Sequence, residues 1–103
     1  MTEAQFRVGV DADGTTPVVA ALGDIDLANV AQFQDEMSRA AAGSTVLTVD
    51  LTEVNYCDSA AVRALFAVAA ATDLTMIVSA AGPITTLLGI SGLDRVATVV
   101  VRE

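Results

Sequence analysis

The hydrophobic and polar positions of the chain fall into strand-like and helix-like stretches. Residues 46–51 are almost all apolar or β-branched, which is typical of a central strand covered on both faces of a sheet. Residues 17–22, 74–79 and 96–101 form comparable apolar runs, and residues 6–10 alternate apolar and polar side chains as a half-buried strand does. The pattern predicts a sheet of about five strands.

A first helix is predicted between the second and third of these strands. From residue 27 to residue 42, apolar side chains recur at helical spacing with polar residues opposite them. Asp26 is suited to cap the start of this helix. Asp35 and Arg39 form an i, i+4 pair of favourable polarity. We therefore expect a surface helix with one buried stripe.

Two further helices separate the remaining strands. The second begins at Ser59 or Ala60 and runs to about Ala71, and the third is a short helix that follows Pro83 and ends at Gly89. The buried stripe of the second helix is predicted to comprise Val62, Leu65, Phe66 and Ala69. Its other side, which is small and flat apart from the arginine, comprises Ala60, Arg63, Ala64, Ala67 and Ala71. This side reflects either the helix propensity of alanine or a docking face for a partner.

The order of these elements defines the fold class. Crossovers through a helix make parallel strand pairs, whereas the first two strands are close enough in sequence to form a hairpin. The 103 residues suffice for one core and leave no room for a second domain. We expect an α/β protein, with a single domain over residues 1–103 and a mixed, mostly parallel sheet of about five strands on which three or more helices pack.

The charge of the chain restricts its partners. The formal net charge is −8, and the five basic residues are all arginines, with neither lysine nor histidine. A basic stripe is the electrostatic signature of nucleic-acid binding, so we expect neither nucleic acid nor an anionic membrane surface as a partner. The acidic charge favours a basic partner, although solubility alone would also account for it.

We expect a soluble, cytoplasmic protein without direct membrane insertion. The single cysteine, Cys57, excludes an internal disulfide framework and suits a reducing compartment, and we interpret it as a small core residue. The N-terminus is polar and does not resemble a signal peptide. The longest apolar run, residues 64–71, is shorter than the roughly 20 residues that span a bilayer.

The composition offers little for catalysis. Without histidine or lysine, and with one cysteine, the usual pairs of nucleophile and base cannot be assembled. The chain has no G-x-x-x-x-G-K-[ST] phosphate loop and too few ligands for zinc. A phospho-aspartate receiver with Asp50 as its acceptor is excluded because such domains use a lysine. We therefore predict a protein that is not an enzyme and has no catalytic residue, no metal and no cofactor.

Two acidic connections carry the candidate chemistry. Asp58 and Ser59 stand at the start of the second helix, where free N–H groups and the helix dipole favour oxyanions. Ser59 is therefore either a capping residue or the acceptor of a phosphoryl group, and its position alone favours capping. Asp24 and Asp26 precede the first helix, and we interpret them as cap and turn residues because a metal site needs further oxygen ligands.

Three blocks stand in order along the chain. They are Gly-Asp-Ile-Asp-Leu at residues 23–27, Tyr-Cys-Asp-Ser-Ala-Ala-Val at residues 56–62, and Ile-Ser-Gly-Leu-Asp-Arg-Val at residues 90–96. Together they resemble the STAS family, the anti-sigma factor antagonists and their relatives, in which the serine after the aspartate is the regulated phosphorylation site. The resemblance covers almost the whole chain and implies one STAS-like domain over residues 1–103.

The resemblance implies a function and its partners. Such antagonists bind an anti-sigma factor when unphosphorylated, which frees a sigma factor for transcription. A serine kinase, often the anti-sigma factor itself, inactivates the antagonist by phosphorylating the serine, and a metal-dependent serine phosphatase restores it. ATP is then the cofactor of the kinase and not of this chain.

The resemblance also implies which residues act. Ser59 is the phosphoacceptor, and Asp58 caps and orients the turn. The implied partner surface comprises Asp24, Asp26, Asp58, Ala60, Ala61, Arg63 and Ala64. Relatives commonly have glycine where Ala61 stands, so the helix start of this chain should be stiffer. Arg63 is suited to pair with a phosphate or with Asp58.

Two other functions share the fold. STAS domains also serve as accessory subunits of lipid or other membrane transporters, in which case a transporter ATPase would be retained as the partner. A ligand-binding regulatory module is the third hypothesis, and thermal stabilisation by a nucleotide would favour it. Because many relatives add a final helix that is absent here, we expect one face of the sheet to be thinly covered, and a homodimer would cover it.

Overall fold

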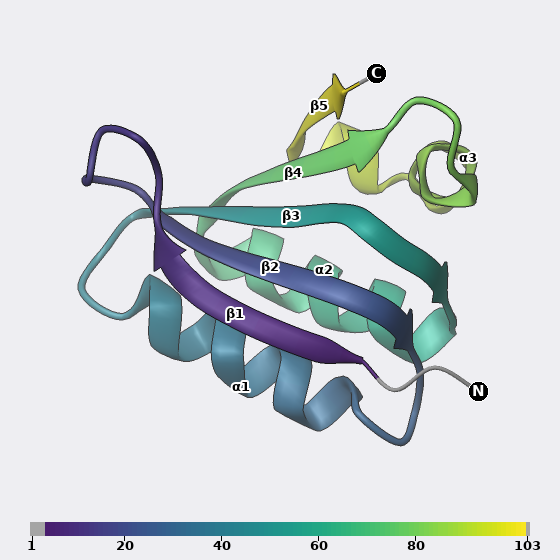
Figure 1. The fold of residues 1–103 in the computed structure, drawn as a ribbon, viewed down its shortest axis with the longest axis horizontal. Helices are drawn as coiled ribbons and strands as arrows, with labels where there is room; N and C mark the ends of the chain where they lie inside the picture. Colours follow the sequence, from purple (N-terminus) through teal and green to yellow (C-terminus); the bar gives the residue numbers. More distant parts are fainter. Residues whose placement is uncertain (1–3, 103) are drawn as a thin grey trace.

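A five-stranded sheet forms the centre of the computed structural model, which describes residues 4–102 (Figure 1). The strands lie in sequence order across the sheet and are β1 (Gln5–Val10), β2 (Pro17–Ile25), β3 (Val46–Cys57), β4 (Asp73–Ser79) and β5 (Thr98–Arg102). The helices are α1 (Val30–Ala41), α2 (Ser59–Ala71) and α3 (Pro83–Ser91), and the 3₁₀ turn η1 (Leu93–Arg95) follows α3.

The connectivity confirms the predicted fold class. β1 and β2 form an antiparallel hairpin, whereas β2 with β3, β3 with β4, and β4 with β5 are parallel pairs. α1 connects β2 to β3 and α2 connects β3 to β4, as parallel pairing requires. The carboxyl ends of β2 and β3 therefore lie next to each other at one edge of the sheet, where open α/β sheets place their functional loops.

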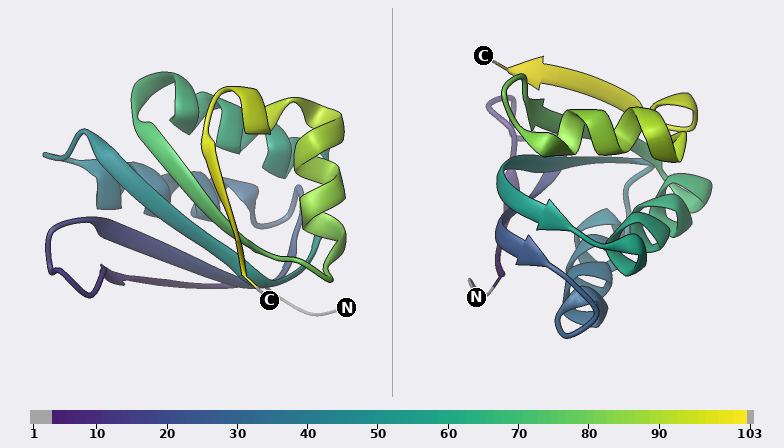
Figure 2. Two further views of the ribbon diagram at one scale, coloured as in Figure 1. Left: turned by 90° about the horizontal axis from the view of Figure 1, so that it is seen from above. Right: turned by 90° about the vertical axis from the view of Figure 1, so that its right-hand side faces the viewer.

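Only one face of the sheet is covered by α1 and α2. Both helices lie behind the sheet in Figure 1, and Figure 2 shows them together on one side of it. Side chains on this face, such as Val19, Val49 and Met76, are buried, whereas their neighbours along each strand are half-buried. The prediction that β3 is covered on both faces was therefore wrong, since Thr48 and Asp50 lie on the open face.

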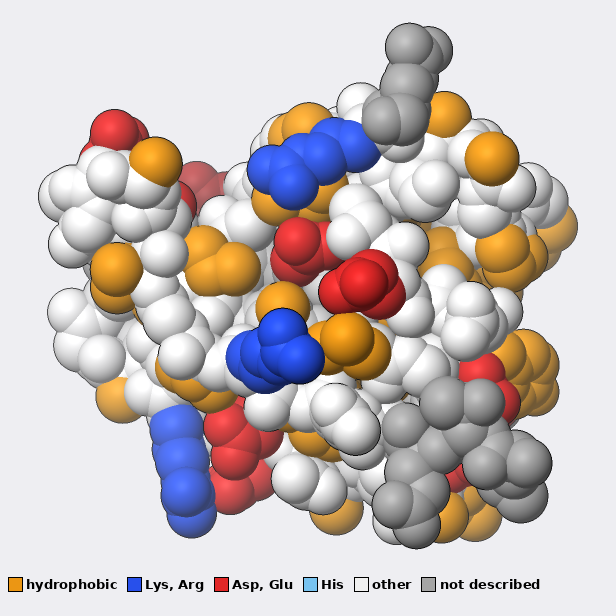
Figure 3. All heavy atoms as spheres, viewed as in Figure 1, with side chains coloured by type: hydrophobic (Ala, Val, Ile, Leu, Met, Phe, Trp, Pro, Cys, Tyr) orange, Lys and Arg blue, Asp and Glu red, His pale blue; other side chains and the backbone are white. Residues whose placement is uncertain are grey.

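The open face mixes apolar and charged side chains (Figure 3). The strand registers align one row across all five strands, which comprises Arg7, Ala20, Asp50, Ile77 and Val100. A thinly covered sheet face was expected, and the half-buried residues on this face confirm it. A homodimer that covers the face stays a prediction.

β3 extends beyond its predicted end at residue 51 and reaches Cys57. Two irregularities in its pairing with β2 make this extension possible. One extra residue of β3 is inserted so that Leu22 pairs with Glu53, and a second insertion follows Gly23. Gly23 has a φ of +90°, which a residue without a Cβ adopts at little cost. The insertions allow Val54 as well as Cys57 to face the core.

α1 begins later than predicted and has the expected buried stripe. Phe33 and Met37 are fully buried, and the ring of Phe6 in β1 stacks on Phe33 with 5.3 Å between centroids. Asp35 and Arg39 form the predicted i, i+4 ion pair, with 3.1 Å between the Arg39 Nε and the Asp35 Oδ2. Both side chains are exposed, so the pair contributes little to stability.

α2 has the predicted bounds but a different buried side. The fully covered residues are Ala61, Ala64, Leu65 and Val68, whereas Val62, Phe66 and Ala69 are only half-buried. The helix packs against α1 as well as against the sheet, so its buried stripe is turned toward α1. The prediction that Ala64 is exposed was therefore wrong.

α3 also runs further than predicted. It passes through Gly89 to Ser91, and Gly92 ends it with a left-handed φ of +84°. The last strand begins at Thr98 rather than at Val96, because the 3₁₀ turn η1 comes first.

Candidate functional site

Asp58 caps α2. β3 ends at Cys57, the backbone of Asp58 is extended, and the helix begins at Ser59. The Asp58 Oδ1 accepts hydrogen bonds from the N–H groups of Ala60 and Ala61, at 3.0 and 3.1 Å. Of the two capping candidates in the sequence, Asp58 is the cap and Ser59 is the first residue of the helix.

The same carboxylate also holds the connection between β2 and α1. The Asp58 Oδ2 accepts a hydrogen bond from the N–H of Leu27 at 3.0 Å, and the N–H of Asp58 donates to the carbonyl of Ile25 at 3.1 Å. One side chain thus joins two connections that are 31 residues apart in the sequence. The sequence signal for this contact was the presence of an acidic connection after each of two adjacent parallel strands.

Ser59 is exposed on the first turn of α2. Its hydroxyl is therefore accessible to a modifying enzyme, as the phosphoacceptor hypothesis requires. A helix N-terminus ordinarily favours an anion, but here the Asp58 carboxylate already occupies the N–H groups of Ala60 and Ala61. A phosphate on Ser59 would be a second anion at a position that already holds one.

Asn29 closes the turn between β2 and α1, because its N–H donates to the carbonyl of Asp26 at 3.1 Å. The Asp26 Oδ1 accepts a hydrogen bond from the N–H of Ala28 at 3.0 Å. The Asn29 Oδ1 accepts from the N–H of Asp26 at 3.1 Å, and its Nδ2 donates to the carbonyl of Asp24 at 2.9 Å. The predicted capping role of Asp26 was wrong, because α1 starts after Asn29, but Asp26 is a turn residue as interpreted. Asp24 lies in β2 and joins the turn through its backbone carbonyl alone, so the role of its side chain stays a prediction. Sequence reasoning missed Asn29.

Cys57 is a buried core residue beside the carboxylates. Its exposed fraction is 7%. Burial, and then the Asp58 and Asp24 carboxylates, raise the pKa of the Cys57 thiol to about 12. The interpretation as a small core residue is confirmed, and a thiol with this pKa is a poor nucleophile. The effect of both carboxylates on Cys57 also shows that this end of β3 lies in a negative field.

The remaining candidates on α2 divide into buried and exposed residues. Ala61 is fully buried and Ala64 is 4% exposed, so the side chains of these two are not available to a partner and their predicted place on its surface was wrong. Ala60 is half-buried and Arg63 is exposed. The surface next to Ser59 therefore includes Arg63 but not the side chains of Ala61 and Ala64, whereas Ala67 and Ala71 further along α2 are exposed as predicted.

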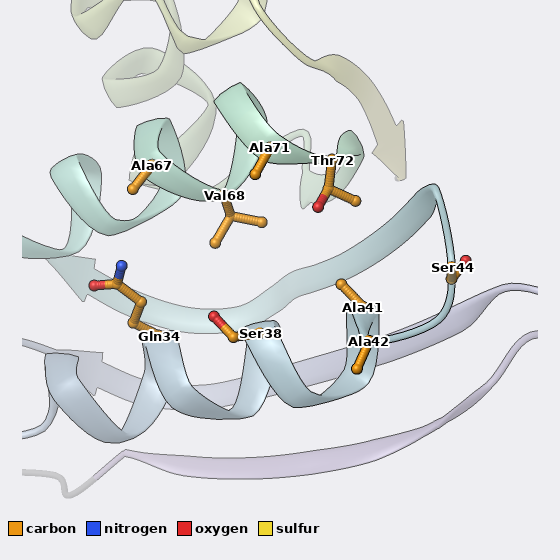
Figure 4. A pocket seen from close by; sticks show the side chains of 9 residues that line it. All are labelled: Gln34, Ser38, Ala41, Ala42, Ser44, Ala67, Val68, Ala71 and Thr72. Atoms are coloured by element: carbon orange, nitrogen blue, oxygen red, sulfur yellow. The ribbon is translucent and has the colours of Figure 1, made fainter.

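A groove of about 300 Å³ lies between α1 and α2 near their C-terminal ends (Figure 4). It is lined by Gln34, Ser38, Ala41, Ala42, Ser44, Ala67, Val68, Ala71 and Thr72. In Figure 4 the side chains of Gln34, Ser38 and Val68 project between the two helices. None of the residues implicated around Ser59 lines this groove, so it is separate from the candidate site.

Residues 4–102 contain no group of three or more acidic or cysteine side chains that would hold a metal ion. Across the same residues, no helix has the length and apolar character needed to cross a membrane. The candidate site brings the exposed residue Ser59 together with the Asp58 carboxylate and the two N–H groups that it caps.

Fold and site together define a class of small α/β proteins, in which an Asp-Ser pair starts the helix after a central parallel strand. A family model described as "Mlab, STAS domain" matches residues 8–102. The chain belongs to the STAS domain family. No curated protein matches it in sequence.

Solved structures share the fold. An anti-sigma factor antagonist from Mycobacterium paratuberculosis superposes with a TM-score of 0.82 at 20% identity, over 95% of this chain and 86% of that one. SpoIIAA, an anti-sigma factor antagonist in its unphosphorylated form, gives a TM-score of 0.57 at 18% identity, over 89% and 97%. An uncharacterized protein from Shewanella loihica with a SpoIIAA-like fold gives 0.63 at 13% identity, over 100% and 91%. At these identities the similarity shows a shared fold.

Proposed function

We propose that this chain is an anti-sigma factor antagonist that binds its anti-sigma factor while Ser59 is unmodified and is released when Ser59 is phosphorylated. The observation that carries the proposal is the exposed Ser59 hydroxyl directly after the Asp58 cap, at the carboxyl end of a central parallel strand. Membership of the STAS family, and a fold shared with two anti-sigma factor antagonists, support it.

Electrostatics supply the switch. Phosphorylation of Ser59 adds about −1.5 to −2 charges and three strong acceptor oxygens. The N–H groups of Ala60 and Ala61 already bond to the Asp58 carboxylate, so the phosphate would stand beside a like charge. A partner packed over Ser59 would have to desolvate that charge, and a penalty of about 3 kcal/mol weakens binding by more than a hundredfold.

The proposal includes three kinds of partner. An anti-sigma factor binds the unmodified surface, a serine kinase that uses ATP adds the phosphate, and a serine phosphatase removes it. The chain itself is a single STAS domain over residues 1–103 without an enzymatic activity, and it acts in the cytoplasm on transcription. Arg63 stands four residues after Ser59 on α2, within reach of a phosphate on that serine, and would be its counter-ion.

The test is a pull-down from host lysate with wild type, Ser59→Ala, Ser59→Glu and Ser38→Glu as parallel baits. Ser38 is the matched control, because it is an exposed serine on α1 outside the candidate site. Mass spectrometry should identify an anti-sigma factor that wild type, Ser59→Ala and Ser38→Glu retain and Ser59→Glu loses. Incubation of wild type and Ser59→Ala with the captured kinase and ATP should phosphorylate the wild type alone.

Equal retention of the anti-sigma factor by all four baits would contradict the switch at Ser59. A second candidate is an accessory subunit of a membrane transporter, because the matching family model carries the description Mlab and STAS domains also serve in transporters. Retention of a transporter ATPase in place of the anti-sigma factor would favour this second function.

A further inference from the structure

The end of β3 has a strand neighbour on one side only. β4 pairs with β3 over residues 46–50, whereas β2 continues to pair with β3 as far as Cys57. α3 occupies the place beside the free edge, contacts β3, and lies at this end of the sheet in Figure 1. A groove of about 200 Å³ remains between the strand and the helix, which we name the β3–α3 groove, and it is lined by Asn55, Tyr56, Cys57, Pro83, Ile84 and Leu87.

The β3–α3 groove is apolar and small. Cys57 and Ile84 are buried at its base, Leu87 is half-buried, and Tyr56 is 55% exposed. Pockets for small molecules typically measure about 300–1,000 Å³, whereas a cavity of about 150 Å³ holds a benzene-sized group. The volume therefore suits one large apolar side chain better than a metabolite or a cofactor.

Two acidic residues neighbour residues of the groove. Asp58 follows the groove residue Cys57 directly, and Asp24 is the Cα partner of Tyr56 in the sheet. Burial raises the pKa of the Cys57 thiol most, and the Asp58 and Asp24 carboxylates raise it further, so both carboxylates lie near this groove residue. The six lining residues carry no charge themselves. An apolar seat beside two carboxylates is complementary to a segment that combines an apolar side chain with a cation.

We propose that the β3–α3 groove receives one large aliphatic or aromatic side chain of the protein partner, from a segment that carries lysine or arginine beside it to meet Asp24 and Asp58. The proposal rests on the proposed function, since it makes the groove part of the surface that docks next to Ser59. Tyr56 and Cys57 lie two to three residues before that serine, so the groove and the phosphorylation site belong to one surface. A single anchor side chain in a pocket is the usual centre of such an interface.

The test is a selection of short random peptides displayed on phage against the unphosphorylated full chain, followed by fluorescence titration of the best synthetic peptides. The selected peptides should share one large apolar residue with lysine or arginine within about one helical turn of it. Tyr56→Ser and Leu87→Gln should each weaken their binding by about tenfold or more. Asp24→Asn should weaken it by a few fold, and more at low than at high salt.

Ile90→Gln is the matched control. Ile90 is an apolar residue of the same helix α3, is 80% exposed and does not line the groove, so its replacement should leave the affinity unchanged. Thermal unfolding of every variant checks that the fold is retained. Peptides without the apolar and basic pair, or peptides that bind Tyr56→Ser as tightly as wild type, would overturn the proposal, as would a selection that yields no binder.

The outcome separates the groove from the phosphorylation switch. Peptides that require Tyr56 and Leu87 establish the groove even if Ser59→Glu retains the anti-sigma factor, in which case only the switch fails. Conversely, Ser59→Glu could lose the anti-sigma factor while Tyr56→Ser retains it fully. That result would support the phosphorylation switch and would show that the partner does not dock in the groove.

Discussion

α1 and α2 lie side by side on the same face of the sheet, yet they are held in different ways. α1 buries two large side chains, Phe33 and Met37, and its N-cap residue Asn29 makes no side-chain capping bond to it. α2 buries two alanines, Leu65 and Val68, and its start is fixed by the two hydrogen bonds that Asp58 accepts. The helix that carries the candidate serine is thus anchored by a cap and by close packing of small residues.

The difference predicts which substitutions each helix tolerates. The two large buried side chains hold α1 in place without help from the polar turn before it. That turn is attached instead to Asp58, whose carboxylate accepts a hydrogen bond from the N–H of Leu27. α2 has no bulky residue in its first turn, so the position of Ser59 depends on one carboxylate and on the space left beside Ala61 and Ala64. Substitutions at these points should reveal the contrast.

The largest effect on the free energy of unfolding is expected from Ala64→Glu. Ala64 is 4% exposed, so a glutamate there must bury an unpaired charge or a protonated carboxyl and must also overfill the contact with the core. We expect a loss of more than about 4 kcal/mol in the free energy of unfolding, measured by urea titration and circular dichroism.

Ala67→Glu on the same helix is the control. Ala67 is exposed, and its replacement should change the free energy of unfolding by less than about 0.5 kcal/mol. Similar stabilities for the two variants would mean that α2 is not turned toward α1 as described.

A smaller effect is expected from Asp58→Ala. The variant loses two capping bonds to α2 and the bond to Leu27, and we expect a cost of about 2–3 kcal/mol in the free energy of unfolding. Amide hydrogen exchange should rise at Leu27, Ala60 and Ala61 together, because one carboxylate serves all three.

Asn29→Ala provides the comparison at the other helix. It removes two hydrogen bonds of a turn whose helix is anchored by bulk, so we expect a cost of about 1 kcal/mol and faster exchange around α1 alone. If Asn29→Ala destabilised the protein as much as Asp58→Ala, the two helix starts would not differ in the way described.

The sequence predicted the features that depend on hydrophobic periodicity and on capping residues. It did not predict the features that depend on strand pairing or on packing between helices. The parallel order of the strands and a cap at Asp58 or Ser59 follow from local signals, and the hydrogen bonds of the structure identify Asp58 as the cap. The length of β3 does not, because it depends on two insertions opposite β2 that only the sheet register reveals. The burial of Ala64 depends on contact with α1, which the spacing within α2 does not contain. Asn29 was missed because asparagine in a polar connection looks like any other turn residue.

The smallest effect on the free energy of unfolding at neutral pH is expected from ionisation of Cys57, which lies where β3 meets the start of α2. Its pKa in the folded protein is raised from the ordinary 9.0 to about 12, by burial and by the Asp58 and Asp24 carboxylates. The unfolded chain therefore loses its thiol proton first, so the free energy of unfolding should fall as the pH rises from 9.0 toward 12. Below pH 9 the folded thiolate fraction should be about a thousandfold lower than in the unfolded chain.

Two measurements check this expectation. Iodoacetamide at pH 8 should alkylate the protein slowly in buffer and rapidly in urea, and Cys57→Ala should show a smaller loss of stability between pH 9 and pH 11. Alkylation at equal rates in both conditions would mean that the thiol is accessible and that the end of β3 opens readily. Cys57 lines the β3–α3 groove and directly precedes Asp58, the cap of α2. Opening of this end of β3 would therefore also loosen the Asp58 cap, which is the feature that distinguishes the start of α2 from the start of α1.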